Sequence, residues 1–122
     1  MKKKVLLVDD NYDDFVHLMG NDQWEVIPTR AVHSTGAALF MIRTHPEADK
    51  ILLDGTFISP MGVRDYCSSV VEELTEEERM KIICFSDEPD NWKPVLSQYG
   101  MRHFPGKGGD FYACIMDTCS CA

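Results

Sequence analysis

Acidic, hydroxyl and amine side chains follow apolar runs along this chain in a pattern suited to phosphate chemistry. They are Asp9 and Asp10 after residues 5–8, Asp54 after residues 51–53, Ser86 after residues 82–85, and Lys107 after a weaker run. Residues that follow the strands of a parallel sheet gather at its carboxyl edge, where α/β proteins place their sites. Three carboxylates, a hydroxyl and an amine at one edge would suit a divalent metal ion and phosphoryl transfer.

The elements that must position these residues alternate along the chain. Short apolar runs separated by helix-like segments predict βα units and a parallel sheet. We expect strands at residues 5–8, 24–27, 50–53, 81–85 and 102–105. We expect helices at residues 11–19, 35–45, 62–71, 91–99 and 110–118. The second strand is expected at a sheet edge because Pro28 follows it.

Local signals refine the helix ends. Ser34 is expected to cap the second helix, and Gly20-Asn21 is expected to end the first. Pro94 is tolerable only in the first turn of its helix, since proline removes a backbone N–H. The acidic stretch at residues 72–78 is typical of a solvated helix end and loop, and we do not interpret it as a binding site.

Size and charge limit the possible functions. The 122 residues suffice for one domain, and the net charge of −8 argues against direct binding to nucleic acid or to anionic membranes. The basic run Lys2-Lys3-Lys4 precedes an apolar stretch too short for a signal peptide. No run reaches the length needed to span a membrane. We therefore expect a soluble, cytoplasmic protein.

The five cysteines do not form a disulfide framework, because their number is odd and their spacing is irregular. Cys67 and Cys84 are isolated from the others, and Cys84 is expected in the core. Cys114, Cys119 and Cys121 cluster near the C-terminus, where a soft metal would need a fourth ligand. We favour an ordinary helix cysteine and two tail residues over a metal site.

The ordered set of polar residues resembles the receiver domain of two-component response regulators, the CheY-like family, over essentially the whole chain. In that family an acidic pair follows the first strand, a phosphoaccepting aspartate ends the third, a serine or threonine ends the fourth, and a lysine follows the fifth. The matching residues are Asp9, Asp10, Asp54, Ser86 and Lys107. The loop at residues 54–62 keeps the family's proline-methionine-glycine character, and Phe104 matches its aromatic switch position.

The resemblance implies a single flavodoxin-like domain spanning residues 1–122. Its α/β fold would be a doubly wound, five-stranded parallel sheet of order 2-1-3-4-5 with five flanking helices. It also implies a Mg²⁺ site, whose ligands would be Asp9, Asp10, Asp54 and the backbone carbonyl of Thr56.

By the same resemblance, Asp54 would accept a phosphoryl group from a histidine kinase or histidine phosphotransfer protein. Lys107 would pair with the phosphoryl oxygens, and Ser86 would move to hydrogen-bond another. Phe104 would then repack the face formed by the fourth helix, fifth strand and fifth helix. Apart from this self-catalysed phosphotransfer and slow autodephosphorylation, the chain is not expected to be an enzyme. These residues hold no output domain, so the signal would pass to a downstream protein or to a domain missing here.

The chain departs from the family pattern at two positions. Asp87 replaces the small residue that usually follows the switch hydroxyl, and Gly108 replaces the proline that usually follows the lysine. A carboxylate at position 87 is expected to repel a phosphodonor. A glycine at position 108 is expected to fix the lysine less firmly.

Two other functions are considered. A degenerate receiver would bind partners without phosphorylation, through a docking surface made of Trp92, Phe111 and Tyr112. A phosphatase of the haloacid-dehalogenase type would use the run that ends in Asp54-Gly55-Thr56, but its nucleophile position holds Leu52, which cannot attack phosphorus.

Overall fold

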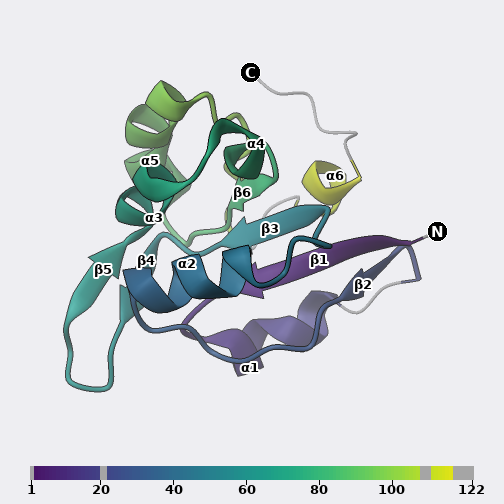
Figure 1. Ribbon diagram of the computed structural model, residues 1–122, viewed down its shortest axis with the longest axis horizontal. Helices are drawn as coiled ribbons and strands as arrows, with labels where there is room; N and C mark the ends of the chain where they lie inside the picture. Colours follow the sequence, from purple (N-terminus) through teal and green to yellow (C-terminus); the bar gives the residue numbers. More distant parts are fainter. Residues whose placement is uncertain (1, 20–21, 108–110, 117–122) are drawn as a thin grey trace.

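A parallel sheet lies at the centre of the molecule. The computed structural model describes residues 2–19, 22–107 and 111–116. The strands of the sheet are β1 (Lys3–Val8), β2 (Trp24–Val26), β3 (Lys50–Leu53) and β6 (Ile82–Cys84). They are parallel and lie in the order β2-β1-β3-β6, as Figure 1 shows. The predicted α/β class is confirmed, and so is the edge position of the second strand.

Each face of the sheet carries its own apolar layer. Leu6 and Val8 of β1 belong to one buried cluster, and Val5 and Leu7 belong to the other. Successive side chains of a strand point to opposite faces, so the continuous apolar run of β1 fills both layers. Burial on both sides is typical of parallel sheets and leaves the strand ends as the places where polar residues reach solvent.

Helices cover both faces of the sheet (Figure 1). Three that pack on one face are α2 (Thr35–Arg43), α3 (Cys67–Glu73) and α5 (Pro89–Leu96). The opposite face is covered by α1 (Tyr12–Phe15), the 3₁₀ helix η1 (Val16–Met19) and α6 (Phe111–Ile115). A short helix, α4 (Glu76–Arg79), precedes β6, and a 3₁₀ turn, η2 (Ser97–Tyr99), follows α5. No helix in the described ranges is both long and apolar enough to cross a bilayer.

The helix caps follow the sequence signals. The hydroxyl of Ser34 accepts a hydrogen bond from the Ala37 N–H at 3.1 Å, as predicted for a cap of α2. The acidic stretch forms the end of α3 and the start of α4, where Thr75 and Glu78 make a reciprocal capping box.

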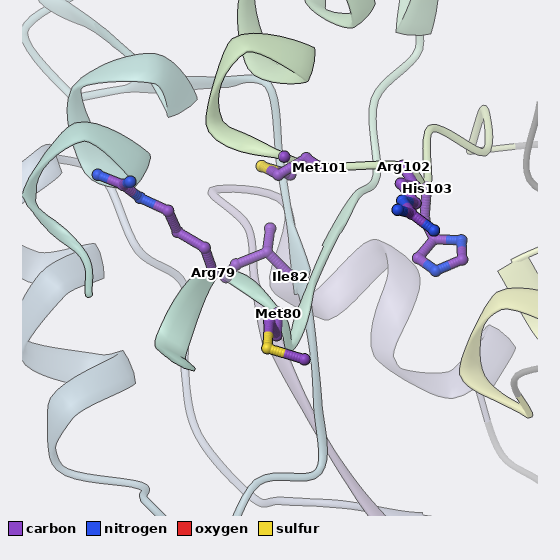
Figure 2. Close-up of a pocket in the computed structure, with 7 residues that line it drawn as sticks. Arg79, Met80, Ile82, Met101, Arg102 and His103 are labelled. Atoms are coloured by element: carbon purple, nitrogen blue, oxygen red, sulfur yellow. The ribbon is translucent and has the colours of Figure 1, made fainter. Parts of the chain in front are cut away.

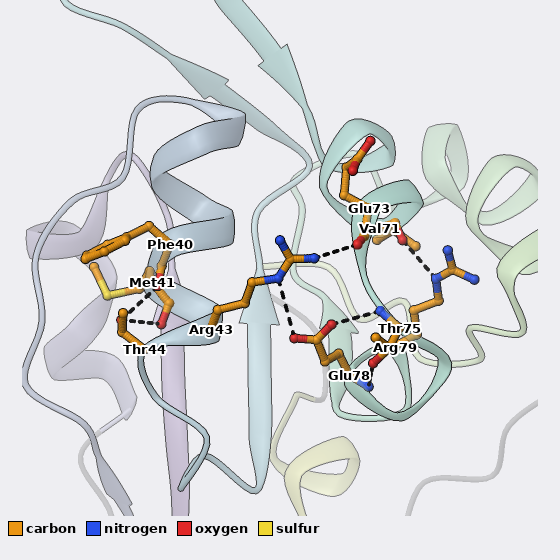
Figure 3. A network of polar contacts seen from close by, with 9 residues as sticks. All are labelled: Phe40, Met41, Arg43, Thr44, Val71, Glu73, Thr75, Glu78 and Arg79. Carbon is orange, nitrogen blue, oxygen red and sulfur yellow. Dashed lines mark hydrogen bonds and ion pairs between the residues drawn. The ribbon is translucent and has the colours of Figure 1, made fainter.

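An arginine links α2 to these two helices at the amino end of the strands. Arg43 donates to the Glu73 carbonyl at 2.7 Å and lies 3.8 Å from the Glu78 carboxylate, as drawn in Figure 3. These contacts join the C-terminal ends of α2 and α3 to α4.

The predicted helix at residues 62–71 is wrong in its first half. Residues 56–66 form an antiparallel hairpin of β4 (Thr56–Ile58) and β5 (Arg64–Tyr66), and α3 starts only at Cys67. The Ser59 N–H donates to the Val63 carbonyl across the turn, and Gly62 has a φ of +82°. A three-residue hairpin loop needs such a left-handed residue, which glycine supplies without strain. Figure 1 shows the hairpin projecting at the end of the sheet where β1 and β3 finish.

The predicted fifth strand at residues 102–105 does not form as a strand. The segment lies along β6 and makes one isolated parallel bridge, between Ser86 and Gly106. Two backbone hydrogen bonds flank the bridge, from Cys84 N to His103 O at 3.0 Å and from Lys107 N to Ser86 O at 3.1 Å. Pro105 has no N–H to donate to a ladder, which explains why the pairing stays local. The sheet of the described residues therefore has four strands.

The predicted helix at residues 91–99, which forms as α5, differs from its prediction at the start. It begins at Pro89, so Pro94 lies inside α5 and not in its first turn. Several other predictions fall outside the described residues, namely those on Gly20, Asn21, Gly108, Asp110, Cys119 and Cys121.

Candidate functional site

Three carboxylates from separate segments converge at the carboxyl edge of the sheet. Asp9 and Asp10 follow β1, and Asp54 follows β3, whose last residue, Leu53, pairs with Val8. One oxygen of each carboxylate lies within 4.8 Å of the others. Asp9 is fully buried and Asp54 is only 6% exposed, whereas Asp10 is half-buried. Such a cluster of hard oxygen ligands can hold a divalent cation.

Lys107 reaches the same cluster from the segment beside β6. Its ammonium lies 2.9 Å from Asp9 Oδ2 and 3.4 Å from Asp54 Oδ1, and it is 4.2 Å from the centre of the Phe15 ring. The side chain is only 5% exposed. The backbone N–H of Lys107 donates to the Ser86 carbonyl. The single bridge at Gly106 is therefore enough to bring this lysine to the strand ends.

Burial and crowding shift the protonation of these groups. Burial raises the pKa of Asp54, and the negative charges of Asp9 and Asp10 raise it further, to about 8, although Lys107 opposes this. Burial also raises the pKa of Asp9, against the lowering effect of Lys107. For Lys107, burial alone would lower the pKa, but Asp54 and Asp9 outweigh it and raise the pKa. The cluster therefore has an excess of negative charge that one lysine does not neutralise.

The hairpin contacts the acids through its backbone. Asp10 Oδ2 accepts a hydrogen bond from the Ile58 N–H at 3.0 Å. The hydrogen bonds Cys67 N to Gly55 O and Ser59 N to Val63 O fix which residues of β4 bond to β5. Since these positions alternate, the polar backbone groups of Thr56 and Ile58 point away from β5. The Thr56 carbonyl thus lies on the edge of β4 that faces Asp10.

The two expected switch residues have ordinary structural roles, and of the two only Ser86 lines the cleft. Ser86 is buried, and its hydroxyl accepts a hydrogen bond from the Glu88 N–H at 3.1 Å, so it caps the turn after β6. Phe104 is half-buried against the apolar cluster that includes α2, α3 and α5. Asp87 is exposed at the rim of the site.

An open cleft of about 250 Å³ gives solvent access to the site. The described residues that line it are Asp10, Asn11, Asp54, Thr56, Ile58, Ser86, Asp87, Glu88, Trp92 and Lys107. Trp92 was not predicted here as a site residue. Its neighbour is Gly55, where an added Cβ would overlap the indole nitrogen. A glycine directly after Asp54 was the available sequence signal, but it does not reveal which aromatic residue approaches.

A larger cavity, of about 320 Å³, lies at the opposite end of β6 (Figure 2). It is lined by Arg79, Met80, Ile82, Gly100, Met101, Arg102 and His103. The Arg79 side chain points away from Arg102 and His103 in Figure 2. Its guanidinium donates to the Val71 and Glu72 carbonyls at 2.8 and 3.1 Å and stacks on the Tyr99 ring. Arg79 therefore serves helix packing, and this cavity lacks convergent chemical groups.

The residues of the alternative functions are also placed. Trp92 packs with the cluster on one face of the sheet, whereas Phe111 packs with the cluster on the other, against Phe85. Tyr112 stacks on Trp24, so these aromatic residues do not form one continuous surface. Leu52 is fully buried. The described cysteines Cys67, Cys84 and Cys114 are buried, and neighbouring Cys84 together with burial raises the pKa of Cys67.

Comparisons with protein-family models, with curated proteins and with solved structures gave no match. The fold itself, a parallel sheet with alternating helices, is compatible with a receiver-like domain. Any functional interpretation therefore depends on the geometry of the acidic cleft.

Proposed function

We propose that this protein is a receiver-type phosphoacceptor, which takes a phosphoryl group from a histidine kinase or histidine phosphotransfer protein onto Asp54. The observation that carries the proposal is the contact of one buried lysine with Asp9 and Asp54 at the floor of an open, acid-lined cleft. A nucleophile, candidate metal ligands and a charge stabiliser then lie within reach of one another.

The donor set fits Mg²⁺. Its ligands would be Asp9, Asp10, Asp54 and the backbone carbonyl of Thr56, all hard oxygens of the kind this ion prefers. Burial first, and then the neighbouring acids Asp9 and Asp10, raise the pKa of Asp54, and a bound divalent cation would favour its ionised form. When bound, the metal would offset the repulsion between the carboxylate and an incoming phosphoryl group.

The chain's own residues would carry the transfer. An Asp54 carboxylate oxygen forms a bond to phosphorus as the bond from phosphorus to the donor imidazole nitrogen breaks, and that electron pair stays with the imidazole. Lys107 exchanges its contact with Asp54 for one with the phosphoryl oxygens. The product is an aspartyl phosphate, and the donor is left as histidine.

The signal would pass through Ser86 and Phe104. Ser86 would leave the Glu88 N–H and donate its hydroxyl hydrogen to a phosphoryl oxygen. Phe104, already against the core, would move into the space that this vacates. Both arrangements must differ by only a few kcal/mol for the phosphoryl group to shift the balance.

Intact-mass spectrometry after incubation with acetyl phosphate and Mg²⁺ tests the proposal. We expect a single phosphoryl adduct that is stable in acid and labile in base. Asp54→Asn should abolish it, whereas Asp90→Asn, which changes an exposed carboxylate outside the cleft lining, should not. Labelling of Asp54→Asn at the wild-type level would overturn the assignment. Absence of any adduct in the wild type would favour a binding module that works without phosphorylation.

A further inference from the structure

Trp92 covers the residue that follows the proposed phosphoacceptor. It is half-buried on α5, and its indole nitrogen lies so close to Gly55 that an added Cβ would overlap it. The same Cβ would lie 2.8 Å from Ser86 Oγ. The Gly55 N–H donates in turn to Asp54 Oδ1 at 2.8 Å. The indole nitrogen, the Ser86 hydroxyl and the Asp54 carboxylate therefore surround one small region of the cleft.

The indole ring is held in place while its N–H is left available. Tyr66, at the end of β5, packs against the ring with a centroid distance of 5.7 Å. Within the described part of the chain, the Trp92 N–H has no hydrogen-bond acceptor. By contrast, the Trp24 N–H donates to the Met19 carbonyl at 2.8 Å. An indole N–H that lines an open polar cleft can donate to water there, and an anionic ligand can replace that water as its acceptor.

Charge explains why a neutral donor is useful there. The described lining of the cleft contains four carboxylates, those of Asp10, Asp54, Asp87 and Glu88, and a single cation. That cation is Lys107, which is already paired with Asp9 and Asp54. Lys107 and a bound Mg²⁺ would supply three positive charges against five carboxylates, that of Asp9 included, so a phosphoryl group would meet more negative than positive charge. An uncharged N–H can bind one of its oxygens without competing for the carboxylates.

We propose that the Trp92 indole N–H is a specificity-determining donor to the phosphoryl group on Asp54, and that position 55 is glycine because any Cβ would displace this indole. The inference rests on the proposed function of Asp54 and adds a residue to it. Gly55 does not adopt a left-handed φ, so the requirement is for space. Trp92 and Gly55 then act as a pair that brings a neutral donor to the reacting group.

Binding of beryllofluoride, a phosphoryl mimic, to the Mg²⁺-loaded protein tests this pair. Trp92→Phe keeps the ring and removes the donor, so calorimetry should show affinity reduced about tenfold or more. Gly55→Ala should lose at least a similar factor, because the added Cβ would displace the indole and also crowd Ser86 Oγ. The double variant should lose little beyond Gly55→Ala alone, because the Trp92 contact is already lost in that variant. The affinity for Mg²⁺ alone should stay unchanged in Trp92→Phe.

Fluorescence provides a matched control with the other tryptophan. Trp24→Phe, which leaves Trp92 in place, should keep an emission change on beryllofluoride binding. Trp92→Phe, which leaves Trp24, should lose it. Wild-type affinity in Trp92→Phe would overturn the role of Trp92 while leaving Asp54 as acceptor. No Mg²⁺-dependent binding of beryllofluoride by the wild type would instead overturn the proposed function, and this inference with it.

Discussion

The two ends of the sheet differ in whether their charged groups have enough partners of opposite charge. At the amino end, Arg43 and Arg79 donate to backbone carbonyls at helix ends, and Arg43 also lies near Glu78 (Figure 3). Arg43 is exposed and Arg79 is half-buried, and each has hydrogen-bond acceptors. At the carboxyl end, three carboxylates cluster, two of them contact one buried lysine, and the pKa of Asp54 rises to about 8.

This difference shows why cavity size alone misleads. The larger cavity lies at the amino end, but its arginine at position 79 already has acceptors and a stacking partner. The acidic cleft is smaller, and its groups remain electrostatically unsatisfied. Burial of like charges destabilises the native state, so their persistence at one sheet edge points to a function there.

The largest expected effect is on formation of the phosphoryl adduct, which a change at the carboxyl end should abolish and a change at the amino end should not. Asp54→Asn should abolish the phosphoryl adduct and keep the fold. Arg79→Met, at the amino end, should keep the adduct but lower the free energy of unfolding by about 1–3 kcal/mol, since it removes charge-assisted hydrogen bonds. Urea denaturation and intact mass measure both. If Arg79→Met lost labelling without loss of stability, the two ends would not be independent.

The next effect is stabilisation by metal. Mg²⁺ at 100 times its dissociation constant should raise the free energy of unfolding by about 2.7 kcal/mol, because it binds only the folded protein. Asp10→Asn should reduce this gain by removing one ligand, whereas Asp65→Asn, on the hairpin outside the cleft lining, should not. Thermal unfolding with and without Mg²⁺ measures the gain. Equal gains in both variants would remove Asp10 from the ligand set.

A smaller effect should appear in the pH dependence of the metal-free protein. The pKa of Asp54 is about 8 in the fold against 3.8 without the fold's influence, so the native state binds an additional proton between these values. The contribution of Asp54 to the free energy of unfolding therefore falls as the pH rises from about 4 to about 8. Asp54→Asn removes this dependence. The free energy of unfolding of the variant, relative to that of wild type, should therefore rise by more than about 1 kcal/mol between pH 5 and pH 8. A stability difference that stays constant over this range would contradict the shift.

The smallest expected effect concerns the rim of the cleft. Asp87→Ala removes an exposed carboxylate, so small anionic donors such as acetyl phosphate should label Asp54 a few-fold faster. Asp90→Ala changes an equally exposed carboxylate outside the cleft lining and should leave the rate unchanged. Initial rates of adduct formation compare the two. An unchanged or slower rate for Asp87→Ala would show that this carboxylate does not obstruct the donor.

Much of the sheet could be predicted from apolar runs and local caps. The apolar run that ends at Leu53 predicted β3, and Ser34 predicted the start of α2. Both predictions were possible because each signal lies within a few residues of the element that it predicts. The hairpin was missed because the run Ser59-Pro60-Met61-Gly62 was interpreted through a family resemblance. Its own turn chemistry, with glycine at the left-handed position, favours a hairpin.

The site also has a part that the sequence could predict and a part that it could not. The convergence of Asp9, Asp10, Asp54 and Lys107 follows from strand order, which a sequence pattern can indicate. The approach of Trp92 to Gly55 could not be predicted, since it depends on how α5 packs over the end of β3. Nor does the sequence reveal that one backbone bridge at Gly106 replaces a whole strand in placing the lysine.

The most direct test of the central claim locates the phosphoryl group on the chain. Borohydride reduces an acyl phosphate, and peptide mapping by mass spectrometry then identifies the modified residue. After treatment with acetyl phosphate and Mg²⁺, we predict modification at Asp54 and nowhere else, and none when Mg²⁺ is chelated. Modification at a different residue, or an unmodified Asp54 in a protein that carries the adduct, would contradict the account.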